Sequence, residues 1–245
     1  MVAADQTRLL QTEAGPVPLP PNDLPSDEPP LESYLHLQQM MLLLNCLDWL
    51  WRDGRKTGPE GHRTDYFAAG NLTIYYNARK LKSKDFRGPD FFVVLGTEKR
   101  PRKSWMVWEE EGRYPNVIVE LLSHSTANSD RGLKKEIYQS TFRTPEYFWF
   151  SPDTLEFQGF MLERGVYHPI IPNEQGHYLS EQLQLFLGVY EEQLRFFATD
   201  GQLLPTPKEA AMESSQRAAT EQLRNEKLTA KLRELGVDPD ALSAD

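Results

Sequence analysis

The chain has 245 residues, of which 39% are hydrophobic, so it is long enough to bury one sizeable core. Its single cysteine excludes an internal disulfide and a zinc site built from cysteines. The formal net charge of −9 argues against a nucleic-acid role, because DNA binding draws most of its sequence-independent affinity from neutralising phosphates. We therefore expect one compact domain with extensions.

Residues 1–30 contain seven of the 18 prolines and little periodic hydrophobicity, which predicts an extended segment. The N-terminus lacks a basic region followed by an apolar one, the pattern of a secretory signal. The apolar run Met40–Trp51 is shorter than the roughly 20 residues that cross a bilayer. It predicts a buried helix from near Leu31 to Gly54, with Cys46 as a small core residue. We expect a cytoplasmic protein without membrane contact.

A basic segment follows Asn71–Asn77, which has the composition of a strand. Between Arg79 and Lys103, nine basic residues stand against three acidic ones, opposite to the balance of the whole chain. Either a phosphate backbone meets this segment or its charges belong to an ordinary solvated surface. The residues predicted to contact nucleic acid are Lys82, Lys84, Arg87, Arg100, Arg102 and Lys103.

Two acidic residues accompany apolar strands. Gly88-Pro89-Asp90 leads into Phe91–Leu95, and Glu120 lies within Asn116–Leu122. Both runs read as buried strands. Because side chains alternate along a strand, Glu120 shares its face with apolar neighbours. An ionised acid in such a place costs several kcal/mol, on the order of the penalty for desolvating an ion, unless a metal or an opposite charge compensates.

A helix is predicted to begin at Ser129 or Asp130, after a polar loop. Asp130, Lys134 and Tyr138 then fall at i, i+4 and i+8 along one helix face. This line fits a functional site, and it also fits an ordinary solvated Asp–Lys pair.

These residue types suit metal-dependent phosphodiester hydrolysis. Mg²⁺ prefers oxygen ligands and is often held by one or two carboxylates plus phosphate. Asp90 and Glu120 are the candidate carboxylates, and Mn²⁺ could substitute for Mg²⁺. The ammonium of Lys134 or Lys135 would position the attacking water or stabilise the pentavalent phosphate.

The span from about Phe86 to Phe150 resembles the putative restriction endonuclease family of the PD-(D/E)XK nuclease superfamily. In that family, Pro-Asp opens a strand, an acid ends the next strand and the lysine has migrated to the following helix. Here Leu122 occupies the usual lysine position, so the resemblance assigns the catalytic cation to Lys134, with Asp130, Lys135 and Tyr138 as supporting candidates. The superfamily often adds an acid from an early helix; the candidates are Glu32, Asp48, Asp53, Glu60 and Asp65.

The resemblance implies an α/β fold with a restriction-endonuclease-like three-layer core, in which helices flank a central mixed β-sheet. We expect residues 31–206 to form this domain and residues 207–245 to form a long polar helix and tail. The aromatic run Tyr147–Phe150 and Leu155–Met161 read as two further strands. A hairpin across Asp200-Gly201 is expected to complete or edge the sheet. Four leucines make a thin apolar stripe on the C-terminal helix, without sustained heptads.

The resemblance makes the expected function metal-dependent hydrolysis of DNA, with Asp90, Glu120 and Lys134 as the catalytic residues. A homodimer is expected, since many nucleases that cut both strands are dimers. A first alternative is a catalytically inactive nuclease-fold module that binds DNA or protein. A second is a metal hydrolase that acts on small phosphate esters.

Overall fold

The computed structural model describes residues 24–27, 33–52, 63–77, 86–123 and 126–236. Most of the proline-rich segment 1–30 is outside these ranges. So are several residues singled out in the sequence: Glu32, Asp53, Glu60, Lys82 and Lys84.

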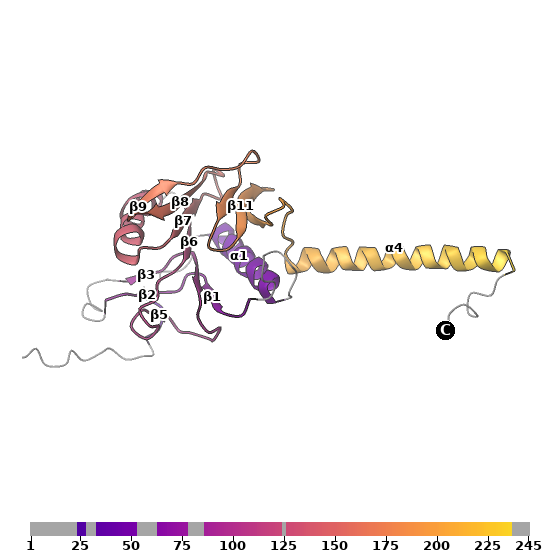
Figure 1. Cartoon of the computed structure of the whole chain (residues 1–245), viewed down its shortest axis with the longest axis horizontal. Coiled ribbons are helices and arrows are strands. Elements are labelled where there is room, and N and C mark those ends of the chain that lie inside the picture. Colours follow the sequence, from indigo (N-terminus) through magenta and orange to yellow (C-terminus); the bar gives the residue numbers. More distant parts are fainter. Residues whose placement is uncertain (1–23, 28–32, 53–62, 78–85, 124–125, 237–245) are drawn as a thin grey trace, which may run out of the picture.

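Six strands form the central sheet, in the spatial order β1-β4-β6-β7-β8-β9 (Figure 1). β6 and β7 pair in parallel while the other neighbours pair antiparallel, so the sheet is mixed. The predicted strands Phe91–Leu95 and Asn116–Leu122 are confirmed as β4 and β6. The strand bounds are β1 Tyr66–Ala69, β4 Phe91–Leu95, β6 Val117–Leu121, β7 Glu146–Phe150, β8 Phe157–Glu163 and β9 Val166–Pro169.

One face of the sheet packs against α1 (Tyr34–Arg52), which confirms the predicted buried helix. α1 carries Leu43, Leu47 and Leu50 at helical spacing, and these leucines join Val117, Val119 and Leu121 of β6 in one apolar cluster. Cys46 is buried in the same cluster, as expected. None of the helices in the described ranges combines the length and apolar character that a bilayer crossing requires.

The opposite face of the sheet is covered by an irregular helical segment, residues 127–142, and by a small sheet of order β3-β2-β5. The predicted α/β core, with a central mixed sheet between helices, is therefore confirmed. The segment consists of α2 Ala127–Ser129, η2 Asp130–Lys134, α3 Lys135–Ile137 and η3 Tyr138–Phe142, and the small sheet of β2 Ile74–Tyr75, β3 Phe86–Arg87 and β5 Trp105–Met106. Both η elements are π-helical turns, a conformation frequently found at functional sites.

The hairpin expected at the edge of the central sheet lies elsewhere. β12 (Gln193–Phe197) belongs to a separate sheet with β10 (Tyr178–Ser180) and β11 (Leu185–Tyr190), and only one bridge, Phe197 to Leu203, continues the predicted hairpin. This sheet packs its apolar side chains into the cluster around α1, which explains why it stacks on the central sheet instead of extending it.

Glu146, the first residue of β7, links the two sheets. Its carboxylate accepts hydrogen bonds from Ser180 Oγ and from the backbone N–H of Gln182 at 3.0 Å. Burial raises the pKa of Glu146 to about 7, against the opposing effect of these hydrogen bonds.

The long polar C-terminal helix is confirmed as α4 (Pro207–Glu234). Thr206 and Glu209 form a capping box: Glu209 N–H donates to Thr206 Oγ1 at 3.1 Å, and Thr206 N–H donates to Glu209 Oε2 at 2.7 Å. Buried Arg195 of β12 also donates to both Glu209 oxygens, at 3.1 and 2.7 Å. These contacts fix the start of α4 to the domain, from which the helix projects (Figure 1).

Candidate active site

Asp90 and Glu120 lie side by side on neighbouring strands. Phe91 of β4 pairs with Val119 of β6, so the residue before β4 reaches the position of Glu120. The backbone N–H of Leu121 donates to Asp90 Oδ2 at 2.8 Å, and the N–H of Asp90 donates to Glu120 Oε2 at 3.4 Å. Glu120 is fully buried, whereas Asp90 is partly exposed.

The helical segment brings three further side chains to Glu120. Lys134 Nζ lies 3.1 Å from Glu120 Oε2 and 2.8 Å from Asp130 Oδ1. Tyr138 donates from its hydroxyl to Glu120 Oε1 at 2.6 Å. The predicted line of Asp130, Lys134 and Tyr138 therefore faces the sheet, and the reading as a solvated ion pair is wrong because Asp130 is fully buried.

Tyr147 of β7 holds the segment in place. Its hydroxyl donates to the backbone carbonyl of Asp130 at 2.9 Å. Since Tyr147 is itself buried beside Tyr138, this bond fixes the helix start relative to β7, which pairs with the strand that carries Glu120. Aromatic side chains that read as core from the sequence thus position the site.

Burial dominates the electrostatics of the acids. Desolvation raises the pKa of Glu120 to about 7 and that of Asp130 to about 6, and it also raises the pKa of Asp90. Burial alone would lower the pKa of Lys134, but the negative charges of Glu120, Asp130 and Asp90 outweigh it and raise that pKa.

The site holds more acid than base. Three carboxyl groups share one ammonium, so full ionisation would leave two uncompensated negative charges in a largely buried place. A divalent cation would balance that excess, and carboxylate oxygens are the ligands that Mg²⁺ prefers. Within the described ranges, no group of three or more His, Cys, Asp or Glu side chains is placed to hold a metal. A metal here would rest on a pair of carboxylates, as Mg²⁺ often does.

The neighbouring Lys135 points elsewhere. Its Nζ lies 3.4 Å from the centroid of the Phe160 ring and 5.3 Å from that of Trp149. Of the two lysines left open by the sequence, Lys134 is therefore the one that contacts the acids.

The predicted contacts with nucleic acid need one correction. Arg102 is 3% exposed at its side chain and stacks over Phe67 and Trp105, and its guanidinium binds both carboxylate oxygens of Glu110 at 2.6 and 2.9 Å. It holds the loop together and is not available to a phosphate. Arg100 is half-exposed and pairs with the same Glu110 at 2.8 Å, so this acid offsets part of the basic charge.

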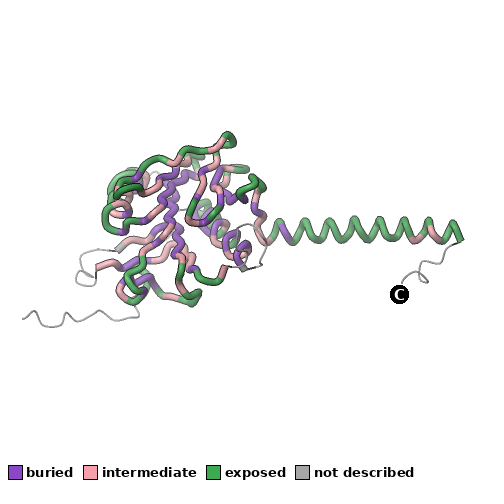
Figure 2. Tube along the Cα trace, viewed as in Figure 1, coloured by how far each residue is buried: buried purple, intermediate pink, exposed green. Residues whose placement is uncertain are grey.

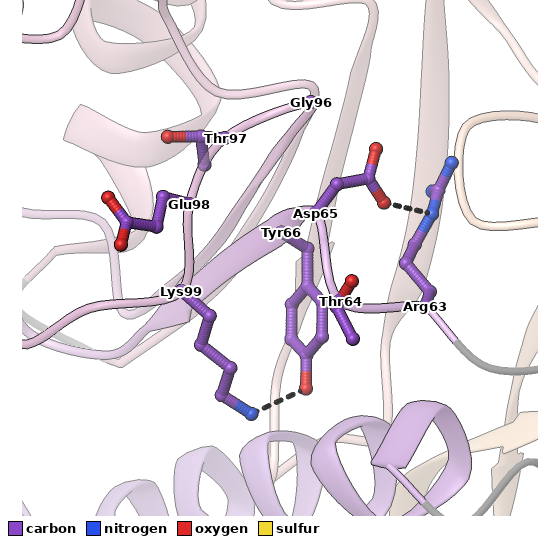
Figure 3. Close-up of a pocket in the computed structure, with 8 residues that line it drawn as sticks. All are labelled: Arg63, Thr64, Asp65, Tyr66, Gly96, Thr97, Glu98 and Lys99. Carbon is purple, nitrogen blue, oxygen red and sulfur yellow. Dashed lines mark hydrogen bonds and ion pairs between the residues drawn. The ribbon is translucent and has the colours of Figure 1, made fainter.

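A pocket of about 740 Å³ lies at the other end of β4 from Asp90 (Figure 3). Its cations are already paired: Lys99 binds Asp48 and donates to Tyr66 at 2.8 Å, and Arg63 lies 3.2 Å from Asp65. Gly96 N–H donates to the carbonyl of Asp65 at 2.7 Å, which fixes Asp65 beyond the end of β4. Neither Asp48 nor Asp65 therefore supplies an additional acid to the site, and the third acid there is Asp130.

A family model described as Uma2, putative restriction endonuclease, matches residues 29–190. The chain belongs to the Uma2 family. The match spans every residue of the site described above and ends before α4, so the Uma2 region is the catalytic candidate and α4 is an addition to it. No curated protein matches the chain.

Among solved structures, the chain is similar to the crystal structure of a putative nuclease belonging to DUF820 from Anabaena variabilis ATCC 29413. The two chains share 11% identity with a TM-score of 0.42, over 64% of this chain and 76% of the other.

Proposed function

We propose that this chain is a divalent-metal-dependent endonuclease that hydrolyses phosphodiester bonds of DNA. The observation that carries the proposal is the convergence of Asp90, Glu120 and Lys134 from three separate elements onto one partly exposed point. Membership of a family described as putative restriction endonucleases supports the reaction class.

Asp90 and Glu120 are the residues that would hold Mg²⁺, or Mn²⁺ in its place. When bound, such an ion neutralises charge that builds up on the phosphate oxygens and lowers the pKa of its water. The chain's contribution is to hold two carboxylates together against their mutual repulsion. Leu121 N–H fixes one of them through Asp90 Oδ2, and Tyr138 fixes the other through Glu120 Oε1.

Lys134 is the proposed catalytic cation. Its ammonium is held between Glu120 and Asp130, yet 21% of its side chain is exposed, so it is both oriented and within reach of a phosphate from solvent. The raised pKa keeps it charged at neutral pH. It would orient the attacking water and stabilise negative charge on the phosphate in the transition state.

DNA would reach the site across the basic segment. Arg87, in β3, lies three residues before Asp90 in the sequence, and Lys103 is exposed on the loop before β5. We propose these two, with Arg100, Lys82 and Lys84, as contacts with phosphates. Because these contacts would neutralise phosphates and release their counterions, affinity should fall steeply as salt rises.

The test compares two adjacent lysines. Nicking of supercoiled plasmid is measured with Mg²⁺, with Mn²⁺ and with EDTA for the natural chain, Lys134→Met and Lys135→Met. We expect metal-dependent nicking that falls about 100-fold or more in Lys134→Met, the loss typical of removing one group that stabilises the transition state. Lys135→Met, which removes the same charge from the same helix away from the acids, should keep most of the activity.

Three results would contradict the proposal. The first is equal loss in both lysine variants, and the second is nicking that persists in EDTA. The third is an inactive natural chain whose melting temperature does not respond to either metal, which would identify a nuclease-fold binding module instead. Hydrolysis of small phosphate esters without plasmid nicking would replace DNA as the substrate.

A further inference from the structure

Beyond its first turn, α4 is not buried by any residue that the structure describes. Ala210 is its one buried residue, and the rest of Pro207–Glu234 is exposed or nearly so along its length (Figure 2). At ~1.5 Å per residue its 28 residues extend about 42 Å. Leu228 and Leu235 leave 53% and 69% of their surface in water. Helices in water depend mainly on packing of an apolar face, so this arrangement calls for a covering surface.

We infer that α4 pairs with α4 of a second copy of this chain, in antiparallel orientation. This inference is independent of the nuclease activity, and it gives the expected homodimer a location. The partner is chosen by the pattern of side-chain size and charge along the helix.

The pattern becomes clear when the two helix halves are compared. The seam positions of the N-terminal half are Ala211, Ser214 and Ala218, and those of the C-terminal half are Leu228, Leu232 and Leu235. These fall at alternating spacings of three and four, the spacing of a two-helix seam. Small residues at one end and large residues at the other cannot fill a parallel pair evenly.

An antiparallel pair brings the two halves together. Seam positions alternate between two sets along the helix, and in an antiparallel pair a position of one set faces a position of the other set. Ala211 therefore meets Leu235 of the second copy, Ala218 meets Leu228 and Ser214 meets Leu232. One register produces all of these layers at once. Each of the three seam leucines then packs over a small residue, which gives even packing along the seam.

The centre of the helix selects the same orientation by charge. Glu221 and Asn225 are the two remaining seam positions. In a parallel pair Glu221 would face Glu221 of the other copy, and like charges at a seam are destabilising. In the antiparallel register Glu221 faces Asn225 and lies beside Arg224 of the other copy, so each acid meets a hydrogen-bond donor and an opposite charge.

The consequence concerns the catalytic domains. Because each domain is attached at the start of its own α4, through Arg195 and Glu209, an antiparallel pair places the two domains at opposite ends of a two-helix rod. The leucine-bearing end of one helix then covers the base of the other.

A pair of leucines provides a matched test. Leu228 lies on the predicted seam and Leu223 lies outside it, although both are 53% exposed. The mass of the full chain is measured by light scattering or sedimentation over a wide range of concentration. We expect the mass of two chains for the natural protein and for Leu223→Lys, and the mass of one chain for Leu228→Lys. A monomeric natural protein, or the same result for both variants, would overturn the inference.

Orientation is tested by disulfide formation between two variants that each add one cysteine to the buried native Cys46, Ala218→Cys and Leu228→Cys. Antiparallel pairing predicts a disulfide only when the two variants are mixed. Disulfides within either variant alone would show a parallel pair and reject the proposed register. Plasmid nicking by the Leu228→Lys monomer separates this test from that of the nuclease, since neither result determines the other.

Discussion

Two buried glutamates lie on neighbouring parallel strands of the same sheet and have different surroundings. Glu120 is the second-last residue of β6, and Glu146 is the first residue of β7. Burial raises the pKa of both to about 7. Glu120 shares its space with Asp90, Asp130 and Lys134, whereas Glu146 meets a serine hydroxyl and backbone N–H groups.

The difference shows that a raised pKa does not identify a functional acid by itself. The oxygens of Glu146 are met by the Ser180 hydroxyl and the backbone N–H of Gln182, and Glu146 thereby joins two sheets. Glu120 lies at the carboxyl end of its strand, where ligands of α/β sheets commonly bind, among charges that do not cancel. The neighbours therefore separate the acid that we propose as a metal ligand from the acid that joins two sheets.

The largest expected effect is on Glu120. Glu120→Gln keeps the shape of the side chain and its bond with Tyr138 but removes a charge from the site. We expect plasmid nicking to fall about 100-fold or more. Stability at pH 8 should change by no more than about 1 kcal/mol, because the buried charge that is lost was costly to hold. Nicking and urea unfolding are measured on the same preparation.

Retained nicking in Glu120→Gln would remove Glu120 from the metal site. A loss of several kcal/mol in unfolding free energy would instead make it a structural residue like Glu146. Glu146→Gln is the matched control for nicking, since it alters an acid of the same sheet away from Lys134, and its activity should match that of the natural chain.

Much of the site follows from local sequence. Pro89-Asp90, the acid inside an apolar strand, and the Asp130–Lys134–Tyr138 spacing are short-range patterns, and the structure brings these residues together. The helices α1 and α4 and the strands β4 and β6 follow in the same way from local apolar runs and helix-forming composition.

What the sequence could not provide depends on contacts between distant residues. Glu146 and Ser180 are 34 positions apart, and no local pattern joins them. Arg102 looked available to DNA because its burial depends on the aromatic rings of Phe67 and Trp105. The hairpin near Asp200 carries a correct turn signal, but its sheet is chosen by pairing with β11, which turn chemistry does not specify.

The second expected effect is a loss of stability when Ser180, the hydrogen-bond partner of Glu146, is replaced. Ser180→Ala removes the hydroxyl that donates to Glu146 and accepts from the N–H of Leu183 at 3.1 Å. Leaving buried groups unsatisfied should cost about 1–3 kcal/mol of unfolding free energy. The loss should be larger at pH 8 than at pH 5, because a charged acceptor depends more on its donors. Plasmid nicking should be unchanged under conditions in which the variant is folded. An equal loss of stability at pH 5 and pH 8 would contradict this account.

The last effect, spread over several pH units, is the pH dependence of stability that Glu146 itself contributes. Its pKa is about 7 in the folded chain and near 4.5 when unfolded, so between these values the folded state binds more protons. Its contribution to stability is therefore present at low pH and is lost as pH rises through 7, by at most ~1.4 kcal/mol per pH unit. Glu146→Gln should remove this slope. The unfolding free energy of the variant, measured in urea, should therefore rise relative to that of the natural chain from pH 5 to pH 8. Glu111→Gln, at a side chain that is 78% exposed, is the control and should run parallel to the natural chain. If Glu146→Gln also ran parallel, the carboxylate at the start of β7 would be ionised in the folded state throughout this range, and the hydrogen bonds from Ser180 and Gln182 would outweigh its burial.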